Sequence, residues 1–532
     1  MKKLFALEKY PCYNNHIMAR YKETDGSQDL LVAINLRNQI VPDTFEWAID
    51  ILIDKIDISL FEENYHNDEL GATAYSPKIL LKVILFCYSR GIISSRRIEK
   101  ACKENIIVKA LAENFEPDHD TIAHFISTNG AAVENLFSQI VMQCYSLKLI
   151  TGEMFAIDGC KLPSNASKEW SGSIADLTKK RDKLKKLIRK LLFQHKELDK
   201  DEKATKKLDK YRETIGDDKE RREKSLKRLE KKLRRLNSFL KNAEPKKGKT
   251  VPEIQSNITD NESARIKGPH GYIQGYNGIG IADSGNQIVV SAEAIGSGPE
   301  AGCFTHMLDS LEEKMKMLTG KEKPLKKALI EGDTGYFSEE NLQEAAKRKI
   351  EVLIPDPQFR QRDPYYAEKK DEKVKKVSKF TVEDFTYDKD ADTYTCPAGN
   401  ELEYKYDVEL RNNKGKQYKA KSGTCINCPL LEKCIKVRTS KNPVRTLYIV
   451  ENKYDENLSE KMKEKIDDPV YRELYSRRMQ IIEPVFSDIT YCKGMNRFTL
   501  RTQKKVNIQW LLFNIVHNIG KCMVPLGLKR GA

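Results

Sequence analysis

The sequence has no uninterrupted apolar stretch of the roughly 20 residues needed to cross a bilayer. The chain begins with Lys2 and Lys3 and a short apolar patch, but Glu8 and Lys9 interrupt that patch, so no export signal is evident. We therefore expect a soluble cytoplasmic protein with no membrane partner. In that reducing compartment the twelve cysteines are expected to remain thiols or to bind metal rather than to form disulfides.

Acidic residues are scarce relative to basic ones. The chain has 93 lysines and arginines against 78 aspartates and glutamates, which gives a net charge of +15 and a pI near 9.0. This surplus favours polyanionic partners through phosphate contacts, although a merely basic soluble protein would show the same balance. With 532 residues the chain exceeds the usual size of one domain, so we expect two or three packed units with insertions.

Residues 1–150 are rich in helical periodicity and predict a small helical domain. Apolar positions recur in the runs 80–85 and 106–111. Two further segments, SSRRIEKAC from Ser94 and PDHDTIAHF, begin with residues that cap helices. Both carry basic side chains, so this domain either contacts DNA or exposes a solvated basic face.

From Gly152 onward, short apolar runs typical of strands replace the helical pattern. These runs are 154–158, 271–283, 287–295, 326–333 and 351–355. The second and third are joined by the tight turn signal DSGN, and helices are predicted at 300–320 and 338–348. The resulting β-β-β-α-β-α-β order is that of an RNase H-like α/β fold with a mixed sheet, which we expect over residues 151–355 and 454–532.

Two insertions interrupt this predicted domain. The first, 171–245, is rich in Lys, Arg, Glu and Leu; its leucines repeat every seven residues from Leu177 and three or four apart from Leu226. This pattern predicts two long coiled-coil-like helices, folded as an antiparallel hairpin around the turn signal TIGDD, although heptad leucines would equally serve association with a second subunit. The second insertion, 356–453, is polar and lysine-rich.

Four cysteines cluster in the second insertion, one in YTCPAGNELEY and three in GTCINCPLLEKC. Four soft thiolates suit a tetrahedral zinc ion, and free or redox-active thiols are the alternative. The spacing between the first cysteine and the CxxC pair leaves room for a small β-hairpin. The candidate zinc ligands are Cys396, Cys425, Cys428 and Cys434.

Three acidic residues occupy positions that suit phosphodiester chemistry. Asp158 is expected to end the strand MFAID, and Asp333 follows the strand KALIEG, with Ser338 capping the next helix. Glu483 is expected on one face of a helix with Phe486. Hard cations such as Mg²⁺ or Mn²⁺ take oxygen ligands, and two ions about 4 Å apart can activate the attacking oxygen and stabilise the leaving one. Solvated surface carboxylates are the alternative.

Longer motifs around these acids resemble DDE transposases of bacterial insertion sequences, in the branch with the YREK signature. The motifs are AIDGCKLPSNAS, SNITDNESARIK, GYIQGYNGIGIAD, EGDTGYFSEENL, YSRRMQIIEPVF and MNRFTLRTQKKVNIQWLLFNIVHNIGK. The resemblance implies an RNase H-like catalytic domain in which Asp158, Asp333 and Glu483 hold two Mg²⁺ or Mn²⁺ ions. It also implies contacts with the DNA ends by Tyr475 and Arg478.

Basic residues near Glu483 are further candidates for DNA contact, because arginine donates two parallel hydrogen bonds to phosphate. Four residues separate Arg478 from Glu483 where the signature has three, and its lysine position meets Thr490, with Lys493 nearby. Solvated helix charges are the alternative. The full set of DNA-contact candidates is Tyr475, Arg477, Arg478, Lys493, Arg497 and Arg501.

The resemblance implies a bacterial, nucleoid-associated transposase that binds the terminal inverted repeats of its own element. Such an enzyme cleaves a DNA strand and then joins the freed 3′-hydroxyl to target DNA. Joining two ends implies a homodimer on paired ends. The alternatives are an RNase H-like nuclease and a non-catalytic DNA-binding regulator derived from a transposase.

Overall fold

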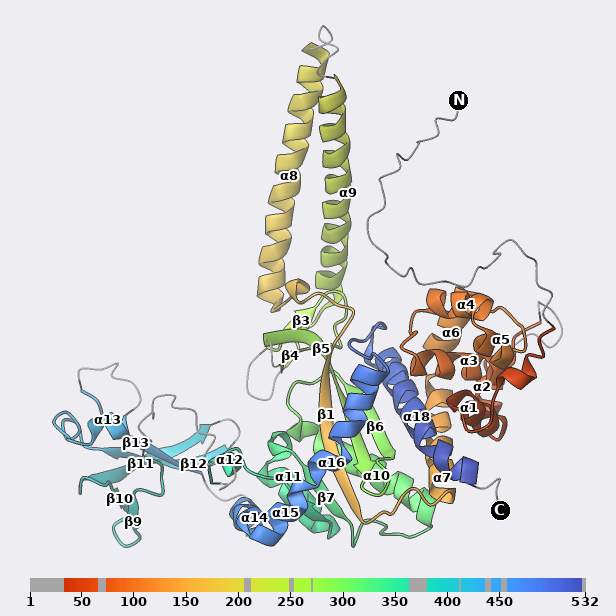
Figure 1. The fold of residues 1–532 in the computed structure, drawn as a ribbon. Coiled ribbons are helices and arrows are strands. Elements are labelled where there is room, and N and C mark those ends of the chain that lie inside the picture. The colour runs from red at the N-terminus through yellow and green to blue at the C-terminus, as the bar shows by residue number, and fades with distance from the viewer. Residues whose placement is uncertain are drawn as a thin grey trace, which may run out of the picture.

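The computed structural model describes most of the chain (Figure 1). The described ranges are 33–65, 73–204, 212–247, 253–268, 271–362, 380–410, 413–435, 442–450 and 457–528. The N-terminal segment considered above for an export signal lies outside these ranges. Within them, no helix is both long enough and apolar enough to cross a membrane.

A unit of seven α-helices opens the described chain. They are α1 (Phe45–Asp54), α2 (Ser59–Glu62), α3 (Pro77–Ser89), α4 (Ser95–Glu104), α5 (Ile106–Leu111), α6 (His119–Thr128) and α7 (Gly130–Ser146). Asp118 caps α6 by accepting a hydrogen bond from the Thr121 backbone N–H, as predicted. Ser94 occupies the N-cap position of α4, but the predicted cap is wrong in that its side chain accepts no backbone hydrogen bond. Helix α3 is buried along almost its whole length because other helices cover it on several sides.

A six-stranded mixed sheet forms the centre of the molecule. Its strands are β1 (Met154–Pro163), β4 (Ala264–Gly268), β5 (Gly271–Asp283), β6 (Val289–Ile295), β7 (Leu329–Gly332) and β8 (Glu351–Leu353). The order is β4-β5-β1-β7-β8, with β6 also paired to β5; β1 runs antiparallel to β5 and parallel to β7. Helices α10 (Phe304–Thr319) and α11 (Glu339–Arg348) connect the parallel strands, and Ser338 caps α11 as predicted.

Two details of the sheet differ from the sequence prediction. The prediction that the first strand ends at Asp158 is wrong, because β1 continues to Pro163 and its polar second half pairs with residues 275–279 of β5. The short polar strand β4 was not expected, since its sequence ARIKG shows no apolar run. In both places backbone hydrogen bonds pair the strands, although the side chains show no apolar pattern from which a strand could be predicted.

The first insertion is an antiparallel helical hairpin that projects from one end of the sheet (Figure 1). It consists of α8 (Ile174–Ala204) and α9 (Arg212–Asn242), and the short pair β2 (Ser171–Gly172) and β3 (Ser256–Asn257) closes its base. Pairing of the two helices within one chain is therefore confirmed. The predicted turn TIGDD is wrong, because residues 214–218 lie inside α9; a single glycine there costs a helix only about 1 kcal/mol.

The second insertion contains a separate five-stranded antiparallel sheet. Its strands are β9 (Thr386–Asp388), β10 (Thr393–Thr395), β11 (Glu401–Leu410), β12 (Asn413–Ala420) and β13 (Thr446–Val450), in the order β13-β12-β11-β10-β9. The predicted hairpin between the first cysteine and the CxxC pair is β11–β12. The sheet and the short α13 (Leu431–Cys434) enclose a small core that includes Leu402, Tyr418 and Leu447.

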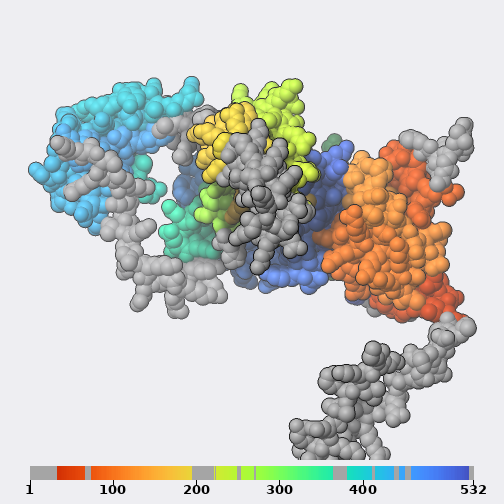
Figure 2. All heavy atoms as spheres, turned by 90° about the horizontal axis from the view of Figure 1, so that it is seen from above, coloured from red at the N-terminus to blue at the C-terminus, as the bar shows by residue number. Residues whose placement is uncertain are grey.

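The C-terminal segment returns to the central sheet through a series of helices. They are α14 (Leu458–Asp467), α15 (Pro469–Ser476), α16 (Arg478–Ile481), α17 (Glu483–Ser487), the π-helix η7 (Asp488–Cys492) and α18 (Gln503–Leu528). Helix α18 packs against β6 and also against α1, α3 and α7, so it joins the N-terminal helices to the sheet. Seen from above, the N-terminal helices α1–α7 and the five-stranded sheet lie on opposite sides of the central unit (Figure 2).

Candidate active site

Asp158 and Asp333 lie on neighbouring parallel strands. Ala156 of β1 pairs with Glu331 of β7, so Asp158, two residues on, corresponds to Asp333, which immediately follows β7. Because side chains two apart on a strand share a face, both aspartates belong to the same face of the sheet. Asp333 also accepts a hydrogen bond from the Gly335 backbone N–H at 2.8 Å, which fixes its carboxylate at the start of a short 3-10 helix.

Arg478 supplies the nearest positive charge to this pair of acids. Its Nη1 lies 3.0 Å from Asp158 Oδ2, and the arginine side chain is largely buried. Burial raises the pKa of Asp158, the negative charge of Asp333 raises it further, and Arg478 opposes both effects. The guanidinium therefore occupies a place where two carboxylates favour a cation.

Glu331 is a buried carboxylate that the sequence analysis missed. Its side chain is fully buried in β7, and neither oxygen has a hydrogen-bond partner among the described residues. Burial raises the pKa of Glu331 to about 8, although Arg478 and Arg477 oppose the shift. The signal was available: Glu331 precedes Asp333 by two positions in the strand, so alternation places both on one face.

Glu300 is another acidic residue that the sequence analysis missed, and it lies close to Gly335 in the loop after β7. Glu300 Oε1 contacts Lys161 Nζ at 3.1 Å and accepts a hydrogen bond from Asn277 at 3.0 Å. Burial raises the pKa of Glu300, and the Asp333 charge adds to the effect. Tyr336 is fully buried nearby, and its hydroxyl has no hydrogen-bond partner within the described ranges. Nothing in the local sequence around Glu300 distinguishes it from a surface acid.

Glu483 is the first residue of α17, and its side chain is exposed. Asp158 pairs directly with Gly280 of β5, and Phe486 of α17 packs over the space where a Gly280 side chain would stand. Helix α17 therefore covers the face of the sheet that carries Asp158. However, in the described part of the chain no three acidic, histidine or cysteine side chains form a metal-binding cluster.

A cleft of about 790 Å³ opens beside Asp333. Its walls include Arg360, Arg472, Tyr475 and Arg478, and also the acids Asp356 and Glu473, so the three arginines and the tyrosine face a space of mixed charge next to Asp333. Burial raises the pKa of Tyr475 to about 12, which keeps its hydroxyl protonated and able to donate a hydrogen bond. Guanidinium groups and a hydroxyl donor suit the oxygens of a phosphodiester.

The other predicted DNA contacts lie in different surroundings. Arg477 is exposed and stands 3.8 Å from Glu473. Arg497 and Arg501 are also exposed, and they donate hydrogen bonds to the backbone carbonyls of Ser164 and Asn165. Both therefore extend the surface beyond the C-terminal end of β1.

Lys493 is buried, and its ammonium group pairs with Asp488. Asp488 also bonds His517 Nδ1 at 2.6 Å, while His517 Nε2 lies 3.0 Å from the Gln287 carbonyl oxygen. Burial alone would raise the pKa of Asp488, but hydrogen bonds from His517 and Lys493 outweigh it and hold the pKa at about 2. His517 is thus a buried histidine whose two ring nitrogens both have hydrogen-bond partners.

Replacing Asp488 by asparagine is expected to lower the melting temperature at pH 7 by about 5 °C, equivalent to about 2 kcal/mol. The Asp488 pKa falls from its ordinary value of 3.8 to about 2, so its stabilisation is complete above roughly pH 5 and disappears as the pH approaches 2. Melting curves of the parent and Asp488→Asn at pH 7, 4 and 2.5 measure this. Asp390→Asn, which changes an exposed aspartate, serves as the control. If the melting-temperature difference between the parent and Asp488→Asn does not depend on pH, the ionic contribution of Asp488 is contradicted.

The four cysteines of the second insertion converge on one cavity of about 20 Å³. The cavity is lined by Cys396, Cys425, Cys428 and Cys434. Burial raises the pKa of Cys434, whereas the neighbouring Arg445 lowers it and the other three thiols raise it. Four thiols around one small space match the donor set of a zinc site, although they do not stand as a formed metal cluster.

Comparison with known proteins finds two matched regions. Residues 34–128 match the family described as Transposase domain (DUF772), and residues 395–523 match the family described as Transposase DDE domain. None of the curated proteins matches the chain. The first region covers α1 to α6, and the second includes the four cysteines and Glu483, whereas Asp158 and Asp333 lie between the two. Both matches indicate a transposase.

Proposed function

We propose that this transposase binds the ends of its own mobile element, cleaves a DNA strand there and joins the freed end to target DNA. The single observation that carries the proposal is the placement of Asp158 and Asp333 on adjacent parallel strands, beside an arginine-lined cleft. The two transposase-domain matches support the substrate class. The strand order β6-β5-β1-β7-β8, with α10 and α11 as connections, supports an RNase H-like catalytic unit, and the sequence motifs support its place in the YREK branch.

Asp158, Asp333 and Glu483 are the residues that we propose to hold Mg²⁺ or Mn²⁺. The donor set fits hard cations, because two carboxylates share one face and a guanidinium already balances them. When bound, two such ions supply activation of the attacking oxygen and stabilisation of the leaving oxygen. Glu483 would complete the set from α17, which lies over the same face of the sheet.

The protein's own side chains have separate tasks in this proposal. Arg360, Arg472 and the Tyr475 hydroxyl bind phosphate oxygens of the strand in the cleft and hold it beside Asp333. Glu331 is fully buried in β7, whereas Asp158, with 18% of its side chain exposed, is partly accessible to a ligand. Arg478 offsets the charge of Asp158, and because it also lines the cleft it would be placed to bind a phosphate oxygen there.

The experiment that tests this function uses duplex DNA carrying the ends of the element. In Mg²⁺ or Mn²⁺ the protein should nick that DNA and join the product to a second duplex, and chelation should stop both steps. Nicking without joining would favour the RNase H-like nuclease. Tight binding to the ends without nicking would favour the non-catalytic regulator. Joining of two ends within one complex would support the homodimer.

We further propose that the four cysteines bind a structural zinc ion. The purified protein is expected to contain about one zinc per chain, and Cys425→Ser with Cys428→Ser should remove it and unfold the five-stranded sheet. Elemental analysis and limited proteolysis measure these effects. Cys87→Ser, which changes a buried cysteine of α3, should retain the zinc. A parent protein without zinc and with four titratable thiols at this site would contradict the proposal.

A further inference from the structure

The lower half of the helical hairpin concentrates positive charge. Residues 174–190 of α8 and 224–242 of α9 together contain sixteen lysines and arginines but only three acidic residues. Their surplus of thirteen positive charges compares with a net charge of +15 for the entire chain. Almost all of the basic character that suggested a polyanionic partner therefore lies on this one segment, next to the sheet.

Most apolar residues of this lower half are buried or half-buried, although Leu187 is exposed. Leu177, Ile188 and Leu236 are buried, whereas Lys227, Lys231, Arg234 and Arg235 are among the exposed residues of α9. Like charges three or four positions apart on a helix repel one another. A polyanion that crosses these helices removes that repulsion and releases its own counterions, so the surface favours a nucleic-acid backbone.

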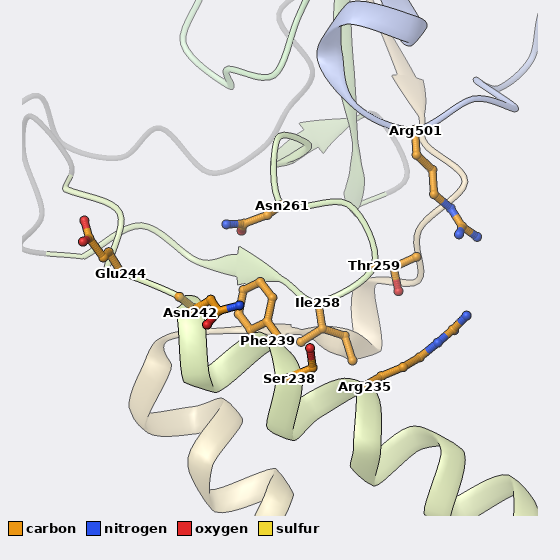
Figure 3. A pocket seen from close by; sticks show the side chains of 10 residues that line it. Arg235, Ser238, Phe239, Asn242, Glu244, Ile258, Thr259, Asn261 and Arg501 are labelled. Carbon is orange, nitrogen blue, oxygen red and sulfur yellow. The ribbon is translucent and has the colours of Figure 1, made fainter. Parts of the chain in front are cut away.

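A cavity of about 730 Å³ lies where the hairpin meets the central unit (Figure 3). Arg235 enters it from α9, and Arg501 enters it from the loop before α18, with Thr259 between them (Figure 3). Asn242 and Asn261 add amide groups, while Glu244 lines the far end. Two guanidinium groups from separate elements, with hydroxyl and amide donors between, make a cradle for phosphate oxygens.

The cavity also continues the surface beyond β1. Arg501 Nε donates to the Asn165 carbonyl at 3.3 Å, just after β1 ends at Pro163. Five residues of strand, about 17 Å, separate Asp158 from Pro163, which corresponds to about five base pairs along a duplex. The seventeen residues 174–190 of α8 extend this surface by about 25 Å, or roughly seven base pairs more.

We propose that the lower hairpin and the Arg235–Arg501 cavity bind the phosphate backbone of duplex DNA, between about five and twelve base pairs from the bond that is cleaved. This inference rests on the proposed function for the position of that bond. It assigns the first insertion to DNA rather than to a second subunit. The contacts are to phosphates, so they hold and orient the duplex without reading its sequence.

The test compares the salt dependence of duplex binding in two matched variants. The hairpin variant carries Lys227→Gln, Lys231→Gln, Arg234→Gln and Arg235→Gln, all at exposed helical positions that glutamine tolerates. The control variant changes four exposed lysines between α10 and β7, namely Lys321→Gln, Lys323→Gln, Lys326→Gln and Lys327→Gln. Both lose four charges, so overall charge is matched.

We expect the hairpin variant to bind at least tenfold more weakly near 0.1 M salt. The slope of log affinity against log salt should become shallower by up to about 3.6, since each of the four lost phosphate contacts contributes about 0.9. The control variant should keep the parent slope, and Arg234→Lys with Arg235→Lys should keep most of it. Hydroxyl-radical footprints should lose protection about five to twelve base pairs from the cleavage site in the hairpin variant alone.

If the salt slope of the hairpin variant equals that of the parent protein, the inference is wrong. If light scattering also shows that this variant loses a parent dimer, the hairpin binds a second copy instead. Failure of the proposed function gives a different result. If the parent protein never cleaves DNA, but the hairpin substitutions still reduce its salt slope, the DNA-binding surface is supported and the proposed function is not. If the parent protein cleaves DNA and the hairpin variant has an unchanged salt slope, the proposed function is supported and the DNA-binding surface on the hairpin is not.

Discussion

Asp333→Asn is expected to abolish metal-dependent cleavage of element-end DNA, with a loss of about 10³-fold or more, while binding of the same DNA is retained. Asparagine keeps the side-chain oxygen that accepts a hydrogen bond from Gly335, so the loop after β7 should stay folded. It removes the negative charge that we propose for cation binding. Gel assays of nicking at equal DNA occupancy, in Mg²⁺ and in Mn²⁺, measure the effect.

The control for this experiment is Asp390→Asn, which changes an exposed acid in the turn between β9 and β10. It should cleave at the parent rate. Cleavage by Asp333→Asn at the parent rate would place the active centre elsewhere in the chain. A variant that loses DNA binding together with cleavage would make Asp333 a structural residue, and melting curves distinguish that case.

Arg478→Ala is expected to lower the metal-free stability of the central unit by about 3–5 kcal/mol, because it leaves the largely buried Asp158 carboxylate without a counter-charge. Asp158 loses its ion pair at 3.0 Å, whereas Glu331, whose pKa burial raises to about 8, is mostly protonated at neutral pH. Mg²⁺ or Mn²⁺ should raise the melting temperature of this variant more than that of the parent, since a cation can replace the guanidinium. Calorimetry with and without the metal measures this difference.

Arg477→Ala is the matched control, because it removes the adjacent arginine from an exposed position. Its melting temperature should change little, and its response to metal should equal that of the parent. Equal metal responses in Arg478→Ala and the parent would contradict a cation site at Asp158. The readout is stability rather than cleavage, so it remains informative if this copy is inactive.

The parts of the fold that could be predicted are those in which a local apolar pattern decides the structure. The run 271–283 coincides with β5, and the heptad leucines correspond to the paired helices α8 and α9. The position of Asp333 after β7 also follows from its local run. The extension of β1 could not be predicted, because residues 159–163 pair through backbone hydrogen bonds to a partner more than a hundred positions away.

The surroundings of the candidate site were less accessible to sequence reasoning. Arg478 matched a DNA-contact motif, yet in the structure it pairs with Asp158, 320 positions earlier in the chain. Lys493 was a candidate for DNA contact, and only the fold shows that it is buried and pairs with Asp488, which also bonds His517. Long-range charge pairs leave no periodic trace in the sequence, whereas Glu331 did leave one through its spacing from Asp333.

The β2–β3 clasp at the base of the hairpin also shortens the path by which the sheet can fold. Asp158 and Gly280 pair although they are 122 positions apart, and the clasp brings together Ser171 and Asn257, which enclose 86 of those positions. Helices form from local contacts within microseconds, so the hairpin can assemble before β1 meets β5. The loop that must then close to pair β1 with β5 is about 36 residues long, and the entropic cost of closing it is about 1 kcal/mol lower than for 122 residues. The β2–β3 pair thus offsets the loop length that the insertion adds to the central β1–β5 pairing, which limits the cost of the insertion for the folding rate.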